Sequence, residues 1–279
     1  MVDAQVEVTL LGPFTVKFGE RTAGPWGRPT AKRLCELIMM NIGRRTSREW
    51  AWEVIFPDAT AVPSGVALSK ALSLARRSLS SLGPGASNLL QSDRAHIWVS
   101  DDVTISVDFL DHEEALRTAL SLEPGYRRDA ALVMALAEEG VLLEEEPYAD
   151  WALRPREALE LLRQRARLVL ARDRSEGHGQ NRPEDVIDAW EACLGHDPAC
   201  EEAASALIQA YCAEGWFSLA HKTHERCRTA LYDLGLHVSS RLEVVHDQAA
   251  FQAVRPRLVE PSGQHDLCQT RALSNAPHS

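Results

Sequence analysis

One predicted helix carries the side chains of this chain that are best suited to contact a nucleic acid. Residues 63–83 read PSGVALSKALSLARRSLSSLG, and Gly and Pro near both ends bracket a helix over 64–82. Its polar side chains fall within an arc of about 120°, whereas leucines and alanines occupy another face. Serine and lysine can reach base edges, and arginine can contact bases or phosphates. The candidates for this chemistry are Ser69, Lys70, Ser73, Arg76 and Arg77.

Other clusters of reactive side chains are weaker candidates. The segment HKTHERC spaces His221, His224 and Cys227 three residues apart on one helix, which could supply part of a zinc or copper site. Because the sequence indicates no fourth ligand, we expect partly exposed histidines, a core thiol and no metal. The acidic groups at 111–114 and 144–146 are expected to be solvated charges and not paired catalytic carboxylates.

Sequence motifs typical of enzymes are missing. The chain contains no GxGxxG, no GxxxxGKS/T and no GxSxG. We therefore expect no cofactor and no enzymatic activity.

The elements around the helix at 64–82 follow the order of a winged helix-turn-helix. VEVTLLGPFTVKFG predicts paired strands, TAKRLCELIMMN and RRTSREWAWEVIF predict two helices, and LLQSDRAHIWVS predicts a hairpin after the third helix. In this fold the second helix and its flanks meet phosphates, the third helix enters the major groove, and the hairpin tip reaches an adjacent groove or the backbone. This order favours DNA contact over a merely solvated polar face. It adds the candidates Arg44, Arg45, Arg48, Arg94 and His96.

From about residue 110 the sequence is helical almost to its end. Helices of similar length, with small residues at contact positions and Gly at the breaks, indicate a tetratricopeptide-like stack. The predicted fold class is therefore mainly α: an α+β winged helix-turn-helix domain followed by an all-α helical repeat domain. We expect the winged helix at residues 1–109, the helical repeats at 110–254, and a flexible tail at 255–279.

The charge distribution indicates which part of the chain would meet an anionic partner. The net charge is −10, with +1 over residues 1–110, −11 over 111–279 and +5 within 28–77. Six cysteines without a CxxC pair suggest reduced thiols. The apolar runs are too short for a membrane span and the start does not resemble a secretory signal, so we expect a cytoplasmic protein without a membrane partner.

Several segments, taken in order, resemble one family of bacterial regulators. LGPFTV and RPTAKRLCELIMMNIGRRTSREWAWEVIFPD are similar to the opening of the DNA-binding domain of the streptomycete antibiotic regulatory protein type, and RAHIWVSDDVTISVDFLDHEEAL is similar to its wing. EEEPYADWALRPREALELLRQR, HDPACEEAASALIQAYCAEGWFSLA and LYDLGLHVSSRLEVVHDQ resemble the bacterial transcriptional activator domain that follows. The resemblance covers about residues 5–252. It implies an OmpR-like winged helix joined to that activator domain.

The sequence leads to two functional hypotheses. The first is a transcriptional regulator, which the resemblance implies is an activator of a secondary-metabolite (antibiotic) gene cluster. It would bind promoter DNA on direct repeats, as a homo-oligomer on DNA, and contact RNA polymerase. Arg44, Arg45, Arg48 and Arg94 would hold phosphates, and the polar face at 69–77 would read the groove. The alternative is a protein-interaction or ligand-sensing adaptor that keeps the winged-helix fold without binding DNA.

Overall fold

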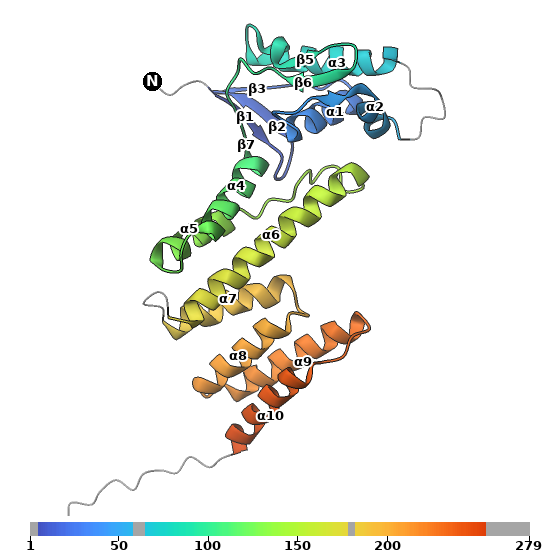
Figure 1. The fold of residues 1–279 in the computed structure, drawn as a ribbon. Coiled ribbons are helices and arrows are strands. Elements are labelled where there is room, and N and C mark those ends of the chain that lie inside the picture. Colours follow the sequence, from blue (N-terminus) through green and yellow to red (C-terminus); the bar gives the residue numbers. More distant parts are fainter. Residues whose placement is uncertain (1–4, 58–64, 178–181, 255–279) are drawn as a thin grey trace, which may run out of the picture.

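The first part of the chain folds around a small sheet (Figure 1). The computed structural model describes residues 5–57, 65–177 and 182–254. The sheet contains β1 (Val6–Thr9), β2 (Thr15–Phe18), β3 (Arg21–Thr22) and β7 (Ile105–Val107), in the order β3-β2-β1-β7. β1 runs antiparallel to β2 and parallel to β7. Alternate residues of β1 are buried, as expected for a strand with one face on the core.

Three helices and a second sheet complete a winged helix. The helices are α1 (Pro29–Met40), α2 (Arg48–Ile55) and α3 (Gly65–Leu79), and short 3-10 turns follow at Ser80–Leu82 and Ala86–Leu89. The wing sheet contains β4 (Thr46–Ser47), β5 (Leu90–Ser92) and β6 (His96–Val99), in the order β4-β6-β5. Pro at the first position of α1 suits a helix start, and Ser47 caps α2 by accepting a hydrogen bond from the Trp50 amide at 3.1 Å.

The rest of the described chain is a stack of helices. α4 (Asp108–Ser121) and α5 (Tyr126–Leu136) pack against α6 (Asp150–Ser175). α7 (Pro183–His196), α8 (Glu201–Ala213), α9 (Phe217–Asp233) and α10 (Ser240–Val254) follow in a row that leads away from the winged helix (Figure 1). The fold class predicted from the sequence, a winged helix followed by a helical domain, is confirmed. Within the described ranges, no helix is long and apolar enough to cross a membrane.

Buried apolar side chains form two clusters that meet within α6. The first cluster runs from Val6 to Leu170, and the second runs from Ala171 to Ala249. The winged helix, α4, α5 and most of α6 therefore share one core. The predicted limit between residues 109 and 110 lies inside this first cluster and stays a prediction. The tail predicted at 255–279 lies outside the described residues.

The segment before α6 is bound to the N-terminal sheet through main-chain atoms. The Leu143 amide donates to the Leu10 carbonyl at 2.8 Å, and the Gly12 amide donates to the Val141 carbonyl at 2.8 Å. Asp108, the first residue of α4, accepts hydrogen bonds from the Leu10 and Leu11 amides at 2.7 and 3.0 Å. These hydrogen bonds join the N-terminal sheet to the start of α4 and to the segment that leads into α6.

Acidic residues of the same segment pair with α1. Glu145 lies 2.7 Å from the Lys32 amine, and Glu146 lies 2.8 Å from the Arg33 guanidinium. Glu145 also accepts a hydrogen bond from the Phe14 amide at 3.1 Å. Residues 144–146 were expected to be solvated charges and not paired catalytic carboxylates, and two of them also form ion pairs with α1. No local sequence pattern indicates this pairing, because the partners are more than 100 residues apart along the chain.

Glu36 of α1 is a buried carboxyl group next to these pairs. Its side chain is 1% exposed, and one of its oxygens has no hydrogen-bond partner among the described residues. Lys32 lies 3.5 Å from the other oxygen. Burial raises the pKa of Glu36 to about 7; Lys32 opposes this rise, and Glu146 adds to it.

The raised pKa of Glu36 predicts a pH-dependent stability. Between about pH 4.5 and 7 the folded chain holds a proton on Glu36 that the unfolded chain has released, so stability falls as the pH rises through this window. The variant Glu36→Gln removes this slope. We expect its advantage over the unmodified chain to grow with pH, to at most about 3 kcal/mol at pH 8. Urea unfolding at pH 5 and pH 8 measures it.

The matched control is Glu7→Gln, which changes an exposed glutamate on β1. Its effect on the unfolding free energy should be small and equal at the two pH values. An equal effect of Glu36→Gln at both pH values would contradict the assignment.

Candidate nucleic-acid interface

The helix α3 is amphipathic, and the packing of its apolar face on the core determines which of its residues are exposed to solvent. Leucines and alanines at helical spacing anchor it to the first core cluster; the buried ones are Leu68, Ala71, Leu72, Ala75 and Leu79. Burying this stripe sets the rotation of the helix about its axis. The side chains left exposed along the other face are Val66, Ser69, Lys70, Ser73 and Arg77.

Of the residues predicted on the polar face of α3, Arg76 is the one whose side chain donates hydrogen bonds to other described residues of the protein. Its Nε donates to the Leu90 carbonyl at 2.9 Å, and its Nη2 donates to the Ser92 hydroxyl at 3.1 Å. Burial lowers the pKa of Arg76, and the nearby charge of Arg48 lowers it further. Arg76 therefore ties α3 to the wing strand β5.

Arg48 performs a similar task between α2 and α3. Its guanidinium donates to the Ser69 hydroxyl at 2.8 Å, and its amide donates to the Ala95 carbonyl at 2.8 Å. The first residue of α2 thus contacts both the wing and α3. Ser69 remains exposed at its position on α3 even though its oxygen accepts this bond.

The wing turn is organised by Asp93. Its carboxylate accepts hydrogen bonds from the amides of Ala95 and His96, both at 2.7 Å, and these bonds lower the pKa of Asp93. Arg45 lies 3.8 Å from Asp93, and its guanidinium stands over the Trp98 ring at 4.4 Å from the ring centre. The His96 ring also points to this carboxylate, at 3.7 Å. Arg45 and His96 therefore contribute to the shape of the wing.

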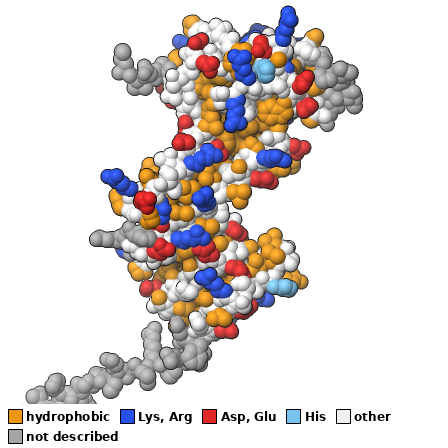
Figure 2. Space-filling model, viewed as in Figure 1, with side chains coloured by type: hydrophobic (Ala, Val, Ile, Leu, Met, Phe, Trp, Pro, Cys, Tyr) orange, Lys and Arg blue, Asp and Glu red, His pale blue; other side chains and the backbone are white. Residues whose placement is uncertain are grey.

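Four of the predicted basic side chains remain available to an outside partner. Each is exposed, and none makes a side-chain hydrogen bond or ion pair with the residues that the structure describes. They belong to three elements, the turn after α1, α3 and the wing turn, and are Arg44, Lys70, Arg77 and Arg94. Figure 2 shows Lys and Arg side chains standing out at the winged-helix end of the molecule, with acidic side chains between them.

Two further residues belong to this surface and were missed in the sequence. Val66 is 78% exposed in the first turn of α3, on the same face as Ser69 and Lys70. Arg28, just before α1, lines a hollow of 320 Å³ together with Lys70. The helical spacing of Val66 could have revealed it, whereas the position of Arg28 depends on how α1 packs on α3.

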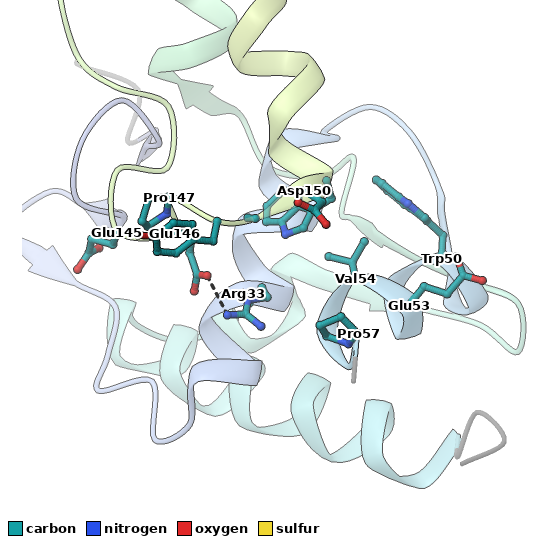
Figure 3. A pocket seen from close by; sticks show the side chains of 12 residues that line it. Arg33, Trp50, Glu53, Val54, Pro57, Glu145, Glu146, Pro147 and Asp150 are labelled. Atoms are coloured by element: carbon teal, nitrogen blue, oxygen red, sulfur yellow. Dashed lines mark hydrogen bonds and ion pairs between the residues drawn. The ribbon is translucent and has the colours of Figure 1, made fainter. Parts of the chain in front are cut away.

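A second concave region lies between α2 and the start of α6 (Figure 3). It has a volume of 590 Å³ and is lined by Trp50 and Glu53 of α2, Tyr148 of the segment before α6, and Asp150 of α6. Arg33 at its edge is already paired with Glu146. Among the described residues, the lining combines three aromatic side chains with four carboxylates.

Comparisons with known proteins support the fold. No family model matches the chain, and no curated protein matches it by sequence. A solved structure that is similar is Mycobacterium tuberculosis EmbR in complex with a low-affinity phosphopeptide, with a TM-score of 0.68 and 19% sequence identity. The match covers 90% of this chain and 66% of that chain, so this chain spans just under two thirds of its length. At this identity the likeness shows a shared fold.

The contacts of Arg76 and Arg77 predict that two adjacent arginines contribute differently to stability. Arg76→Met keeps the apolar stem but leaves the Leu90 carbonyl and the Ser92 hydroxyl without their donor, so we expect a loss of about 1–3 kcal/mol in the free energy of unfolding. Arg77→Met is the matched control and should stay within about 0.5 kcal/mol of the unmodified chain. Urea denaturation compares them, and equal effects would contradict the tethering role of Arg76.

Proposed function

We propose that this protein is a transcriptional regulator that binds promoter DNA through its winged helix. The proposal is carried by a set of cations on three elements of one winged helix, in a chain whose net charge is −10. These cations are exposed and have no partner among the described residues. Such cations can neutralise DNA phosphates, and the counterions that were condensed on the DNA are then released, which favours binding. Their grouping on one winged helix, in an otherwise acidic chain, supports an anionic partner.

The exposed face of α3 would enter the major groove. Lys70 and Arg77 would contact bases or phosphates, and the hydroxyls of Ser69 and Ser73 would accept or donate to base edges. Arg44 and Arg94 would contact the backbone on either side of the groove. In this proposal the exposed side chains of α3, of the turn after α1 and of the wing turn make the direct contacts with DNA.

The remaining predicted residues would act by positioning. Arg76 holds α3 to β5, Arg48 joins α2 to α3, and Arg45 stacks on Trp98 at the wing. Fixing these elements before binding lowers the conformational entropy that association would cost. His96, whose ring lies 3.7 Å from the Asp93 carboxylate, would help to hold the shape of the wing turn.

The family resemblance supplies the finer part of the proposal. It implies a regulator of the streptomycete antibiotic regulatory protein type that activates a secondary-metabolite cluster. Such a protein would act in the cytoplasm, as a homo-oligomer on direct repeats. The helical part, with a net charge of −11 over residues 111–279, would contact RNA polymerase or a second copy of the chain.

A second candidate is an adaptor that keeps the winged-helix fold and binds a protein or a small molecule. The hollow between α2 and α6, lined by Trp50, Tyr148 and carboxylates, favours it. A gel shift over a salt series separates the two functions, because a DNA binder loses affinity steeply as salt rises. An adaptor of this kind shows no shift even at low salt.

The free cations predict how DNA affinity depends on salt. A binding site is first selected from a pool of random duplexes, and the slope of log K against log salt is then measured by fluorescence anisotropy. We expect Lys70→Ala, Arg77→Ala and Arg94→Ala each to weaken binding and to reduce the slope by about 1. Arg127→Ala, an exposed arginine on α5, is the control and should leave the slope unchanged. A variant that combines the three substitutions should show the largest decrease in slope, and an unchanged slope in that variant would contradict the proposal.

Val66 predicts a preference for thymine in the selected site. An apolar side chain on a reading helix packs against the thymine C5-methyl group. Replacing the contacted thymine by uracil removes that methyl, so the unmodified chain should lose roughly 0.8 kcal/mol, about fourfold in affinity. Val66→Ala should lose little from the same replacement. Equal sensitivity of both proteins to uracil at every thymine would exclude this role for Val66.

A further inference from the structure

The helices α9 and α10 lie at the far end of the described chain from the winged helix (Figure 1). A cluster of histidines lies between them. His221 and His224 are three residues apart on α9, and Glu243 and His246 are three residues apart on α10. This spacing places each pair on one helix face. Because α9 and α10 pack together, the two faces meet.

His224 is the buried member of the cluster, and its polar atoms are not satisfied by packing. Its side chain is 5% exposed, and both ring nitrogens are buried without a hydrogen-bond partner among the described residues. Nε2 lies 3.7 Å from a carboxylate oxygen of Glu243, and Nδ1 lies 3.5 Å from Glu225. Buried polar groups are nearly always hydrogen-bonded, so this imidazole needs an explanation.

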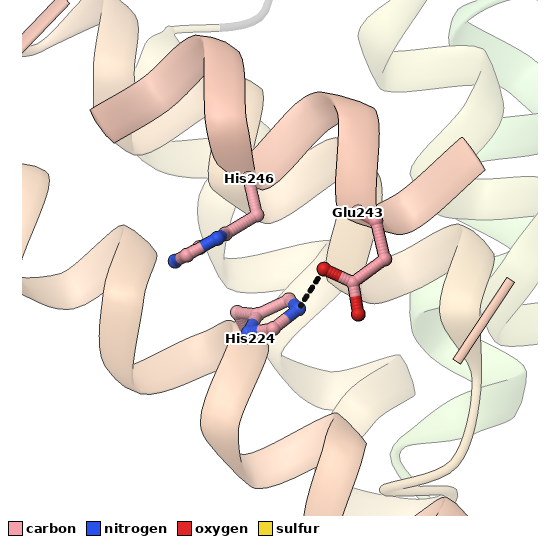
Figure 4. Close-up of side chains that lie close together, drawn as sticks. All are labelled: His224, Glu243 and His246. Carbon is pink, nitrogen blue, oxygen red and sulfur yellow. Dashed lines mark ion pairs between the residues drawn. The ribbon is translucent and has the colours of Figure 1, made fainter. Parts of the chain in front are cut away.

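The side chains from α10 converge on this imidazole (Figure 4). The His246 ring is stacked on the His224 ring, with 4.0 Å between centres and 20° between planes. One potential ligand atom from each of His224, Glu243 and His246 lies within 4.8 Å of the others. Zinc binds imidazole nitrogen and carboxylate oxygen at about 2.0–2.2 Å. Binding one ion with all three atoms would require these side chains to move and one imidazole to rotate out of the stack, because a metal binds an imidazole nitrogen in the plane of its ring.

We propose that His224, Glu243 and His246 bind a divalent first-row transition metal ion, with Zn²⁺ as the best match. Two imidazoles and one carboxylate suit zinc, whereas calcium and magnesium select oxygen ligands. Water would occupy the fourth position. His221 contacts His246 through ring nitrogens 3.1 Å apart and would orient that ring.

The sequence alone argued against this site because HKTHERC offered no further ligand beside Cys227. The structure places Cys227 in the second core cluster, away from the cluster of ligand atoms, and α10 supplies the missing carboxylate and imidazole. A bound ion would fasten α10 to α9. This inference concerns α9 and α10 and does not depend on DNA binding.

The test uses the full chain, stripped with a chelator, and titrated calorimetrically with Zn²⁺ alone at micromolar concentration. We expect one strong site per chain. His246→Gln and Glu243→Gln should weaken it at least tenfold. His237→Gln changes an exposed histidine in the connection before α10 and is the matched control, which should bind like the unmodified chain.

Further measurements keep folding and thiol binding apart from the proposed site. Glu243 is half exposed, so Glu243→Gln should retain the circular dichroism spectrum of the unmodified chain. Co²⁺ in place of zinc should give no thiolate-to-metal charge-transfer absorption. The proposal is overturned if the unmodified chain binds no Zn²⁺, if the two variants bind it as tightly, or if the cobalt spectrum shows a thiolate ligand.

Discussion

Main-chain pairing between the N-terminal sheet and the segment before α6 is the contact on which the arrangement of this protein depends. The Leu143 amide reaches the Leu10 carbonyl at 2.8 Å, and a Cβ on Gly140 would lie only 2.6 Å from that of Leu11. Backbone hydrogen bonds are directional and the surrounding core is close-packed, so this approach holds α6 at a set angle to the sheet. The rotation of α3 follows, because the same core cluster buries its leucines.

The basic residues of the winged helix divide into those that build its surface and those that are free on it. Arg48, Arg76 and Arg45 direct their guanidinium groups to a hydroxyl, a carbonyl and an indole ring of neighbouring elements. Such bonds stiffen the angle between α3 and the wing. Lys70 and Arg77 remain exposed, so the outer face of α3 carries fewer free charges than its sequence suggested.

The two ends of the molecule differ in charge as well as in fold. The segment 28–77 carries a net charge of +5, and residues 111–279 carry −11. On a DNA molecule this asymmetry would favour approach by the winged helix and keep the acidic helices at a distance. α6 contributes to both core clusters and so connects the core of the winged helix to the core of the helices beyond it.

The sequence determined the fold class, because strand alternation and helical periodicity are local patterns that the core enforces. The helical spacing also predicted which face of α3 is buried and which is exposed. Only the tertiary structure decided which charged side chains are paired within the protein. The partners of Arg76 lie in β5, and those of Glu145 and Glu146 lie in α1 and the β1–β2 connection. Two side chains that converge on His224, those of Glu243 and His246, likewise come from the separate helix α10. Contacts between distant segments depend on packing, which no local pattern encodes.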